Sequence, residues 1–138
     1  MMSSPCTLAE SRIVYDKDSV LHLGAKWCPF PDETFYLVVF DPPHLHHIGE
    51  TAWMAKKYGV LKGNWKAVLR DGFRECMRVL KPGGTLVFKW SEVQIRVGQI
   101  WEAIGERPIF GTRCGKSAKT IWACFFKSAY KNNQTTEP

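Results

Sequence analysis

An uninterrupted apolar run that ends at two prolines constrains the fold of this chain more than any other feature. Residues 35–40 read FYLVVF, and Asp41, Pro42 and Pro43 follow directly. A short, continuous run of aromatic and β-branched residues predicts a central strand buried on both faces, as in a parallel sheet. Because proline lacks a backbone N–H, the strand should end where the prolines begin.

Helices and strands alternate after this run. The residues from Trp65 to Leu80 place apolar side chains at three- and four-residue spacing, which predicts an amphipathic helix with Asn64 as its N-cap. The sequence KPGG at 81–84 should stop that helix. The other predicted elements are a strand at 85–90, a helix at 92–104, final strands at 108–111 and 120–127, a short helix near 51–58, and short strands at 12–15 and 20–23. This order predicts an α/β fold with a mostly parallel sheet, in which one of the last two strands runs antiparallel.

Length and hydropathy indicate a single domain. The 138 residues suffice for one core, which we place at 11–127, between flexible ends at 1–10 and 128–138. No apolar run approaches the ~20 residues of a membrane-spanning helix, and the N-terminus lacks the pattern of a secretory signal. The five cysteines include no C-x-x-C pair, which predicts reduced thiols. We therefore expect a cytoplasmic protein with no membrane partner.

The net charge of +6 favours an anionic partner, and nucleic acid is the commonest one. Basic residues concentrate in two stretches, 56–70 and 113–131. A solvated basic surface is the alternative interpretation of each stretch. Four lysines are candidate contacts to an anionic substrate: Lys57, Lys89, Lys116 and Lys119.

Two further sequence patterns resemble a phosphate-binding loop and a metal site, but the first lacks the required glycine spacing and the second lacks enough ligands. Residues 115–117 read GKS, like the end of a P-loop, but Phe110 stands where such a loop needs glycine. The histidines at 44, 46 and 47 have only Glu50 nearby as another ligand, so we predict no metal site. Four tryptophans are interpreted as core or half-buried packing residues: Trp53, Trp65, Trp101 and Trp122.

Two phrases resemble a known family. PFPDETFYLVVFDPP at 29–43 resembles the loop and fourth strand of class I S-adenosylmethionine-dependent methyltransferases. RVLKPGGTLVFKW at 78–90 resembles the helix end, turn and fifth strand of the same fold, in the right order and separation. With the closing strands, the resemblance covers roughly residues 30–127. It implies a Rossmann-like sheet, mostly parallel with an antiparallel closing strand, that is truncated at its N-terminus.

Asp41 to His44 resemble the D/N-P-P-aromatic segment of methyltransferases that act on amino nitrogens, including small phage- or prophage-borne members. The lone pair of an exocyclic amine is delocalised, and acceptors for both N–H groups free it for reaction. The resemblance implies that Asp41 and the Pro42 carbonyl are these acceptors, that Pro43 stiffens the turn, and that His44 stacks on a flat substrate. The implied function is methyl transfer to an amino nitrogen, foremost on a nucleic-acid base, as in DNA modification.

The chain also departs from the family pattern. A glycine-rich cofactor loop is missing, since Gly24 is the sole glycine before Gly49. The resemblance leaves Asp16, Phe30 and Asp41 as the expected contacts to S-adenosylmethionine. A homodimer or a complementary N-terminal half would complete the sheet. The alternative is a truncated, non-catalytic binding module that does not bind the cofactor alone.

Overall fold

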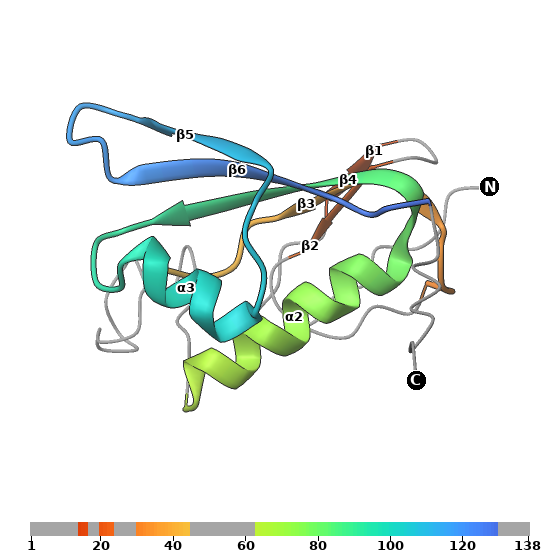
Figure 1. The fold of residues 1–138 in the computed structure, drawn as a ribbon, viewed down its shortest axis with the longest axis horizontal. Helices are drawn as coiled ribbons and strands as arrows, with labels where there is room; N and C mark the ends of the chain where they lie inside the picture. The colour runs from red at the N-terminus through yellow and green to blue at the C-terminus, as the bar shows by residue number, and fades with distance from the viewer. Residues whose placement is uncertain (1–13, 17–19, 24–29, 45–62, 130–138) are drawn as a thin grey trace, which may run out of the picture.

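The computed structural model describes residues 14–16, 20–23, 30–44 and 63–129 (Figure 1). These residues form an open, mixed sheet with two helices. Four strands lie side by side in the order β3 (Phe35–Phe40), β4 (Leu80–Ser91), β6 (Thr120–Phe126) and β5 (Phe110–Cys114). Two short strands, β2 (Val20–Leu23) and β1 (Val14–Asp16), extend the sheet beyond β3. The helices are α2 (Trp65–Val79) and α3 (Val97–Ile104).

The α/β class and the order of elements from β3 onward are confirmed, but a mostly parallel sheet is not. Strands β2, β3 and β4 are parallel neighbours. The β1–β2, β4–β6 and β5–β6 pairs are antiparallel. The reversal of β6 has a simple cause: only residues 115–119 separate it from β5, and a connection this short makes a hairpin rather than a crossover. The predicted helix near 51–58 lies outside the described residues.

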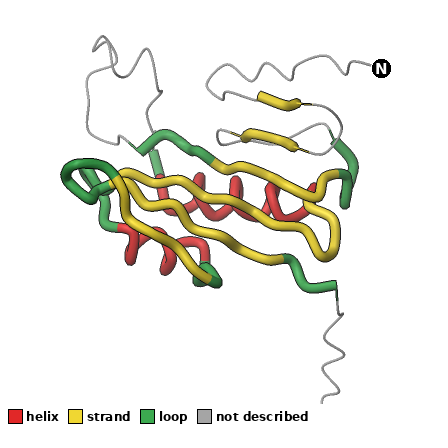
Figure 2. The backbone as a smooth tube through the Cα atoms, turned by 90° about the horizontal axis from the view of Figure 1, so that it is seen from above, coloured by secondary structure: helices red, strands yellow, loops and turns green. Residues whose placement is uncertain are grey.

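Both helices pack against the same face of the sheet (Figures 1 and 2). The connections from β3 to β4 and from β4 to β5 advance in the same direction across the sheet. Because such crossovers are right-handed, their helices fall on one side. The core lies between this face and the helices, and its fully buried side chains include Val38, Phe40, Leu69, Leu86, Phe88, Trp90, Ile100 and Phe125.

The prediction that the FYLVVF strand is buried on both faces is wrong. Val38 and Phe40 are fully buried against the helices, whereas Leu37 and Val39 are half-buried and Tyr36 is 60% exposed. The sequence pattern of a doubly covered strand is present, but no helix of the described residues covers the second face. None of these helices is long and apolar enough to cross a membrane.

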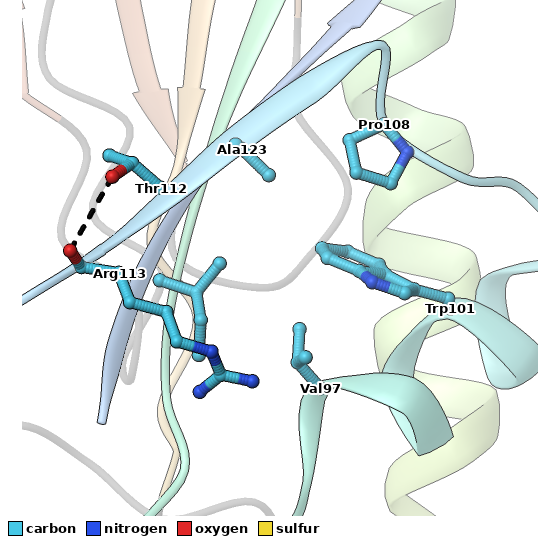
Figure 3. Close-up of a pocket in the computed structure, with 8 residues that line it drawn as sticks. Val97, Trp101, Pro108, Thr112, Arg113 and Ala123 are labelled. Atoms are coloured by element: carbon cyan, nitrogen blue, oxygen red, sulfur yellow. Dashed lines mark hydrogen bonds between the residues drawn. The ribbon is translucent and has the colours of Figure 1, made fainter. Parts of the chain in front are cut away.

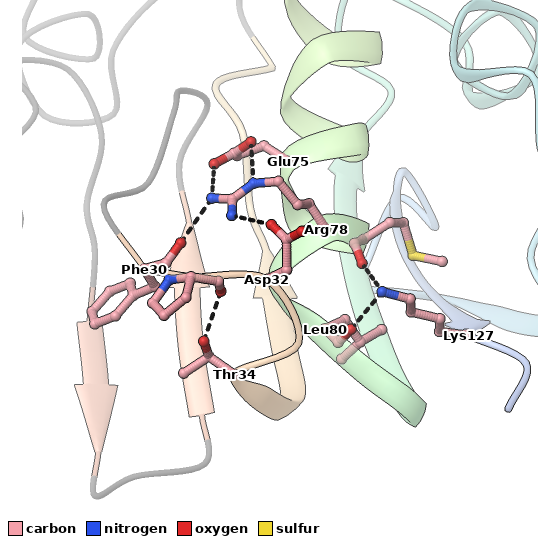
Figure 4. Close-up of polar contacts among 9 residues, drawn as sticks. Phe30, Asp32, Thr34, Glu75, Arg78, Leu80 and Lys127 are labelled. Carbon is pink, nitrogen blue, oxygen red and sulfur yellow. Dashed lines mark hydrogen bonds and ion pairs between the residues drawn. The ribbon is translucent and has the colours of Figure 1, made fainter.

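Helix α2 begins as predicted and ends one residue early. The Asn64 side chain accepts a hydrogen bond from the Ala67 backbone N–H at 3.3 Å, which is an N-cap. At the other end Leu80 is already extended and starts β4. The KPGG sequence is therefore part of β4 and does not form a separate loop between the helix and the strand. Gly84 is required there because a Cβ would lie 2.8 Å from the Lys81 carbonyl oxygen and 2.6 Å from the Leu80 side chain. The Lys127 ammonium donates to the Met77 and Leu80 carbonyls, each at 2.7 Å (Figure 4), and so satisfies carbonyls at the helix end.

Arg78 ties the end of α2 to the segment that leads into β3 (Figure 4). Its guanidinium donates to Asp32 at 2.7 Å and to the Phe30 carbonyl at 2.9 Å. Glu75, one turn earlier on α2, accepts from the same group at 2.5 Å. The hydrogen bonds that Arg78 donates to Glu75 and Asp32 raise its pKa, so the cation persists at any physiological pH. This network fixes where β3 enters the sheet.

Helix α3 begins at Val97, five residues after the predicted start at Glu92. Residues 92–96 form a turn instead, because Glu92 uses its side chain as a cap. Its carboxylate accepts from the Val97 backbone N–H at 2.7 Å and pairs with the Arg113 guanidinium from β5. The hydrogen bond from Arg113 is the main cause of a lowered pKa at Glu92, and burial opposes it. The pair joins the start of α3 to the edge of the sheet.

Replacing Glu92 with glutamine should lower the free energy of unfolding by about 1 kcal/mol at neutral pH, because a charged cap and its ion pair are lost. The folded-state pKa lies below the ordinary value of 4.5, so this stabilisation is complete above that value and disappears as acid protonates the folded carboxylate. Urea denaturation of both proteins across this range checks the prediction. A difference that persists unchanged in acid would contradict it. Arg113→Gln removes the exposed ion pair but leaves the cap on Val97, so it should destabilise the protein less than Glu92→Gln does.

Candidate functional site

The segment from Asp41 to His44 follows the carboxyl end of β3, where proline stops the ladder. Pro42 and Pro43 are buried, while Asp41 and His44 are half-buried and keep contact with solvent. Phe40 pairs with Phe88 in the parallel ladder, so the next residues, Asp41 and Lys89, are neighbours. The Lys89 ammonium lies 3.9 Å from the Asp41 carboxylate, and the two side chains are 38% and 34% exposed. This is a loose ion pair between two partly exposed groups.

His44, which follows β3, packs against the buried Trp90 near the end of β4. Its ring stands edge-on to the Trp90 ring, with 6.4 Å between centroids and 83° between planes. Trp90 is 1% exposed and donates its indole N–H to the Ile95 carbonyl at 2.9 Å, so its ring is fixed. Burial lowers the pKa of His44; nearby Asp41 opposes the shift, and Lys89 adds to it. The imidazole is therefore neutral at neutral pH and can stack or form a hydrogen bond without carrying charge.

A titration of His44 tests these electrostatics. The imidazole should titrate below its ordinary value of 6.5, and the unfolded chain then takes up the proton first, so stability falls as the pH drops below that value. Lys89→Met should raise the midpoint because a cation is removed, whereas Asp41→Asn should lower it further. Proton NMR of the imidazole Cε1–H measures all three midpoints. Equal midpoints in the three proteins would contradict the assigned charges.

Three of the four candidate substrate lysines lie on this rim of the sheet. Lys89 is on β4 itself. Ser91, at the end of β4, pairs with Thr120, so the β5–β6 hairpin reaches the same end of the sheet as Asp41. Lys116 and Lys119 are exposed in that hairpin. The structure thus brings a carboxylate, an imidazole and several cations to one rim, and Lys57 lies outside the described residues.

Two residues predicted to contact the cofactor, Asp16 and Phe30, do not lie near Asp41. Asp16 pairs with Val20, and Val20 pairs with Leu37, so Asp16 is level with a residue four positions before Asp41. That offset is about 13 Å along a strand at the usual rise. Phe30 is at the opposite end of β3 from Asp41, where its ring packs edge-on against Phe35 at 5.0 Å. Its carbonyl accepts from Arg78, so Phe30 has a structural role in the turn before β3.

Trp122 was interpreted as a packing residue, and the structure corrects this. Ile121, Ala123 and Phe125 alternate with it along β6 and are buried against the helices, which turns Trp122 to the opposite face, where it is 38% exposed. It pairs with Lys89 in the ladder, and the Lys89 ammonium lies 5.3 Å from its ring centroid. Burial alternates along β6, but its sequence TIWACFF is almost wholly apolar, so the sequence gives no signal of which residues face outward. Trp65 and Trp101 do pack against the core, as predicted.

A separate hollow of about 190 Å³ lies between α3 and the β5–β6 hairpin (Figure 3). Trp101, Val97 and Pro108 form one wall of it, and Gly111 and Ala123 leave the space open. Arg113 at its edge is already paired with Glu92. Its lining offers no general base, and the Thr112 hydroxyl donates to the Arg113 carbonyl, so the candidate site is the rim at Asp41. The described residues contain no cluster that could hold a metal ion, and His46 and His47 are outside them.

Comparison of the sequence with models of known protein families yields no match, and comparison with curated proteins yields none either. The assignment of a function therefore depends on the residues of the rim and on their arrangement.

Proposed function

We propose that this chain orients an amino nitrogen for methylation, with a nucleic-acid base as substrate and S-adenosylmethionine as the methyl donor. The observation that carries the proposal is the position of Asp41. It is a partly exposed carboxylate at the carboxyl end of a parallel strand, followed by two buried prolines and a half-buried histidine. Ligands of open α/β sheets bind at this end of the strands.

The residues of the rim suit an amine substrate. Asp41 accepts one N–H of the amine, and the Pro42 carbonyl, held by the buried prolines, accepts the other. Both bonds draw the nitrogen toward tetrahedral geometry and make its lone pair available. His44, which burial keeps neutral, supplies a flat ring beside the substrate. Lys89 and the hairpin lysines offer cations to the phosphates of a nucleic acid.

The methyl donor fits the described residues only in part. S-adenosylmethionine supplies an electrophilic methyl group when it is bound. Asp16 and Phe30 lie away from Asp41, so the described residues do not form a complete cradle for this cofactor. The missing contacts fall to residues outside the described ranges or to a second polypeptide, which is either another copy of the chain or a complementary N-terminal half.

A non-catalytic binding module is the second candidate, and the incomplete cradle favours it. The two functions differ in what they require of the cofactor. A module would bind its partner equally well with or without S-adenosylmethionine, and the carboxylate of Asp41 would matter little. An enzyme needs both.

Calorimetric titration of the purified chain with S-adenosylmethionine is the first test. We expect saturable binding at micromolar concentrations, followed by transfer of a radiolabelled methyl group to single-stranded oligonucleotides. A folded chain that neither binds the cofactor nor transfers the label, alone or at concentrations that favour dimers, would overturn the proposed activity and support the module.

A further inference from the structure

We call the sheet face opposite α2 and α3 the open face. Its side chains extend the Asp41 site across the neighbouring strands. Lys89 pairs with Trp122, and Trp122 pairs with Thr112 on β5. Residues opposite each other in neighbouring strands point to the same face. With Asp41 beside Lys89, one row of side chains therefore runs across β3, β4, β6 and β5 from the carboxylate to the edge of the sheet.

The open face exposes large aromatic rings. Trp122 is 38% exposed, Phe126 51% and Phe110 68%. Phe110 pairs with Cys124 and Phe126 pairs with Thr85, and these partners lie on the open face by the same alternation that buries Phe125. Rings this exposed contribute little to the core. A sheet that has two helices behind it and aromatic rings in front has the form of a platform on which flat ligands stack.

Cations accompany these rings. The Lys89 ammonium is 5.3 Å from the centroid of Trp122, and Lys81 lies 4.4 Å from that of Tyr36 at the other end of the strands. Lys116 and Lys119 are exposed at the hairpin tip on the Asp41 rim. Lysine is depleted in the cores of protein–protein interfaces, so lysines against exposed rings argue for an anionic ligand rather than a protein surface. The net charge of +6 is in keeping with a polyanion.

We propose that the open face binds single-stranded nucleic acid, with a base stacked on Trp122 and the backbone following Lys89 and the hairpin lysines. Unpaired bases expose the flat faces that stacking needs, whereas bases in a duplex hide them. This inference deepens the proposed function, on which it rests for its substrate class. It assigns Trp122 to the nucleotide beside the one that enters the Asp41 site, and Phe110 or Phe126 to the next.

The test is a binding measurement that requires no cofactor and no methyl transfer. Fluorescence anisotropy of a dye-labelled twelve-residue oligothymidylate, titrated with the full chain at low salt, should show saturable binding. Trp122→Ala should weaken it about tenfold, the usual loss for one stacked base. Val93→Ala is the matched control, since Val93 is also exposed but lies in the turn after β4. The affinity of this variant for the oligonucleotide should equal that of the parent protein. Lys89→Gln should weaken binding and flatten its dependence on salt.

Three outcomes would overturn the platform. They are absence of binding, equal affinity of the Trp122→Ala and parent proteins, and tighter binding of the duplex than of the single strand. A concentration-dependent dimer that Trp122→Ala abolishes would instead make the open face a protein interface. Failure here is distinguishable from failure of the proposed function. Binding without methylation removes only the enzyme, whereas methylation that Trp122→Ala leaves intact, with unchanged oligonucleotide affinity, removes only the platform.

Discussion

Asp41→Ala should reduce kcat/KM for methyl transfer by a factor on the order of 10²–10³, the usual effect of removing one preorganised hydrogen-bonding group from an active site. The carboxylate is the sole charged acceptor that the D-P-P-H segment offers, and the alanine variant leaves the amine lone pair delocalised. The ion pair with Lys89 should contribute little to stability, because it is 3.9 Å long and partly exposed. Initial rates with a labelled methyl donor, measured beside a thermal melt, check both statements.

Matched variants separate the role of the acceptor from the role of charge. Asp41→Asn keeps an acceptor oxygen and should retain more activity than Asp41→Ala. Lys89→Met removes the neighbouring cation but no acceptor, so it should act on substrate affinity rather than on the chemical step. Methylation that persists in Asp41→Ala with an unaltered kcat would show that Asp41 does not orient the amine. Loss of oligonucleotide binding in the same variant would place Asp41 in the binding surface instead.

Much of the fold follows from local pattern. The strand at 35–40 and the capped helix that starts at Trp65 were predictable because each carries its own periodicity and its own stop or start signal. The start of α3 was not, since it depends on Glu92 accepting from Val97 and meeting Arg113, which is distant in sequence. Whether a strand is parallel or antiparallel depends on which strand it pairs with, and the local sequence does not predict its pairing partner.

The candidate site divides in the same way. Asp41 and His44 are only three positions apart in the sequence, so a motif finds them together, and Lys89 follows from the end of the next parallel strand. Trp122 is predicted to be a core or half-buried packing residue because its strand is almost wholly apolar. Only the placement of both helices on one face leaves it exposed. Asp16 was assigned from its place after a strand, but that strand runs antiparallel to β2 and carries it away from the rim.

Phe88→Ala should produce the largest loss of stability, about 3–5 kcal/mol. The ring is fully buried at the centre of an aromatic cluster, with centroids 5.4 Å from Phe40, 5.5 Å from Trp101 and 6.4 Å from Phe125. A cavity there separates the sheet from α3 and removes the support beneath Lys89. Since small domains are stable by only about 5–15 kcal/mol, part of the population should unfold at moderate temperature.

Urea denaturation measures this loss, and two variants calibrate it. Phe88→Leu keeps most of the volume and should cost less than half as much. Phe126→Ala removes the same side chain from the open face, where it is 51% exposed, and should cost under about 1 kcal/mol. Similar losses at positions 88 and 126 would mean that both faces of the sheet are equally covered. The rings of the open face would then be core residues, and neither a stacking platform nor a one-sided sheet would describe this protein.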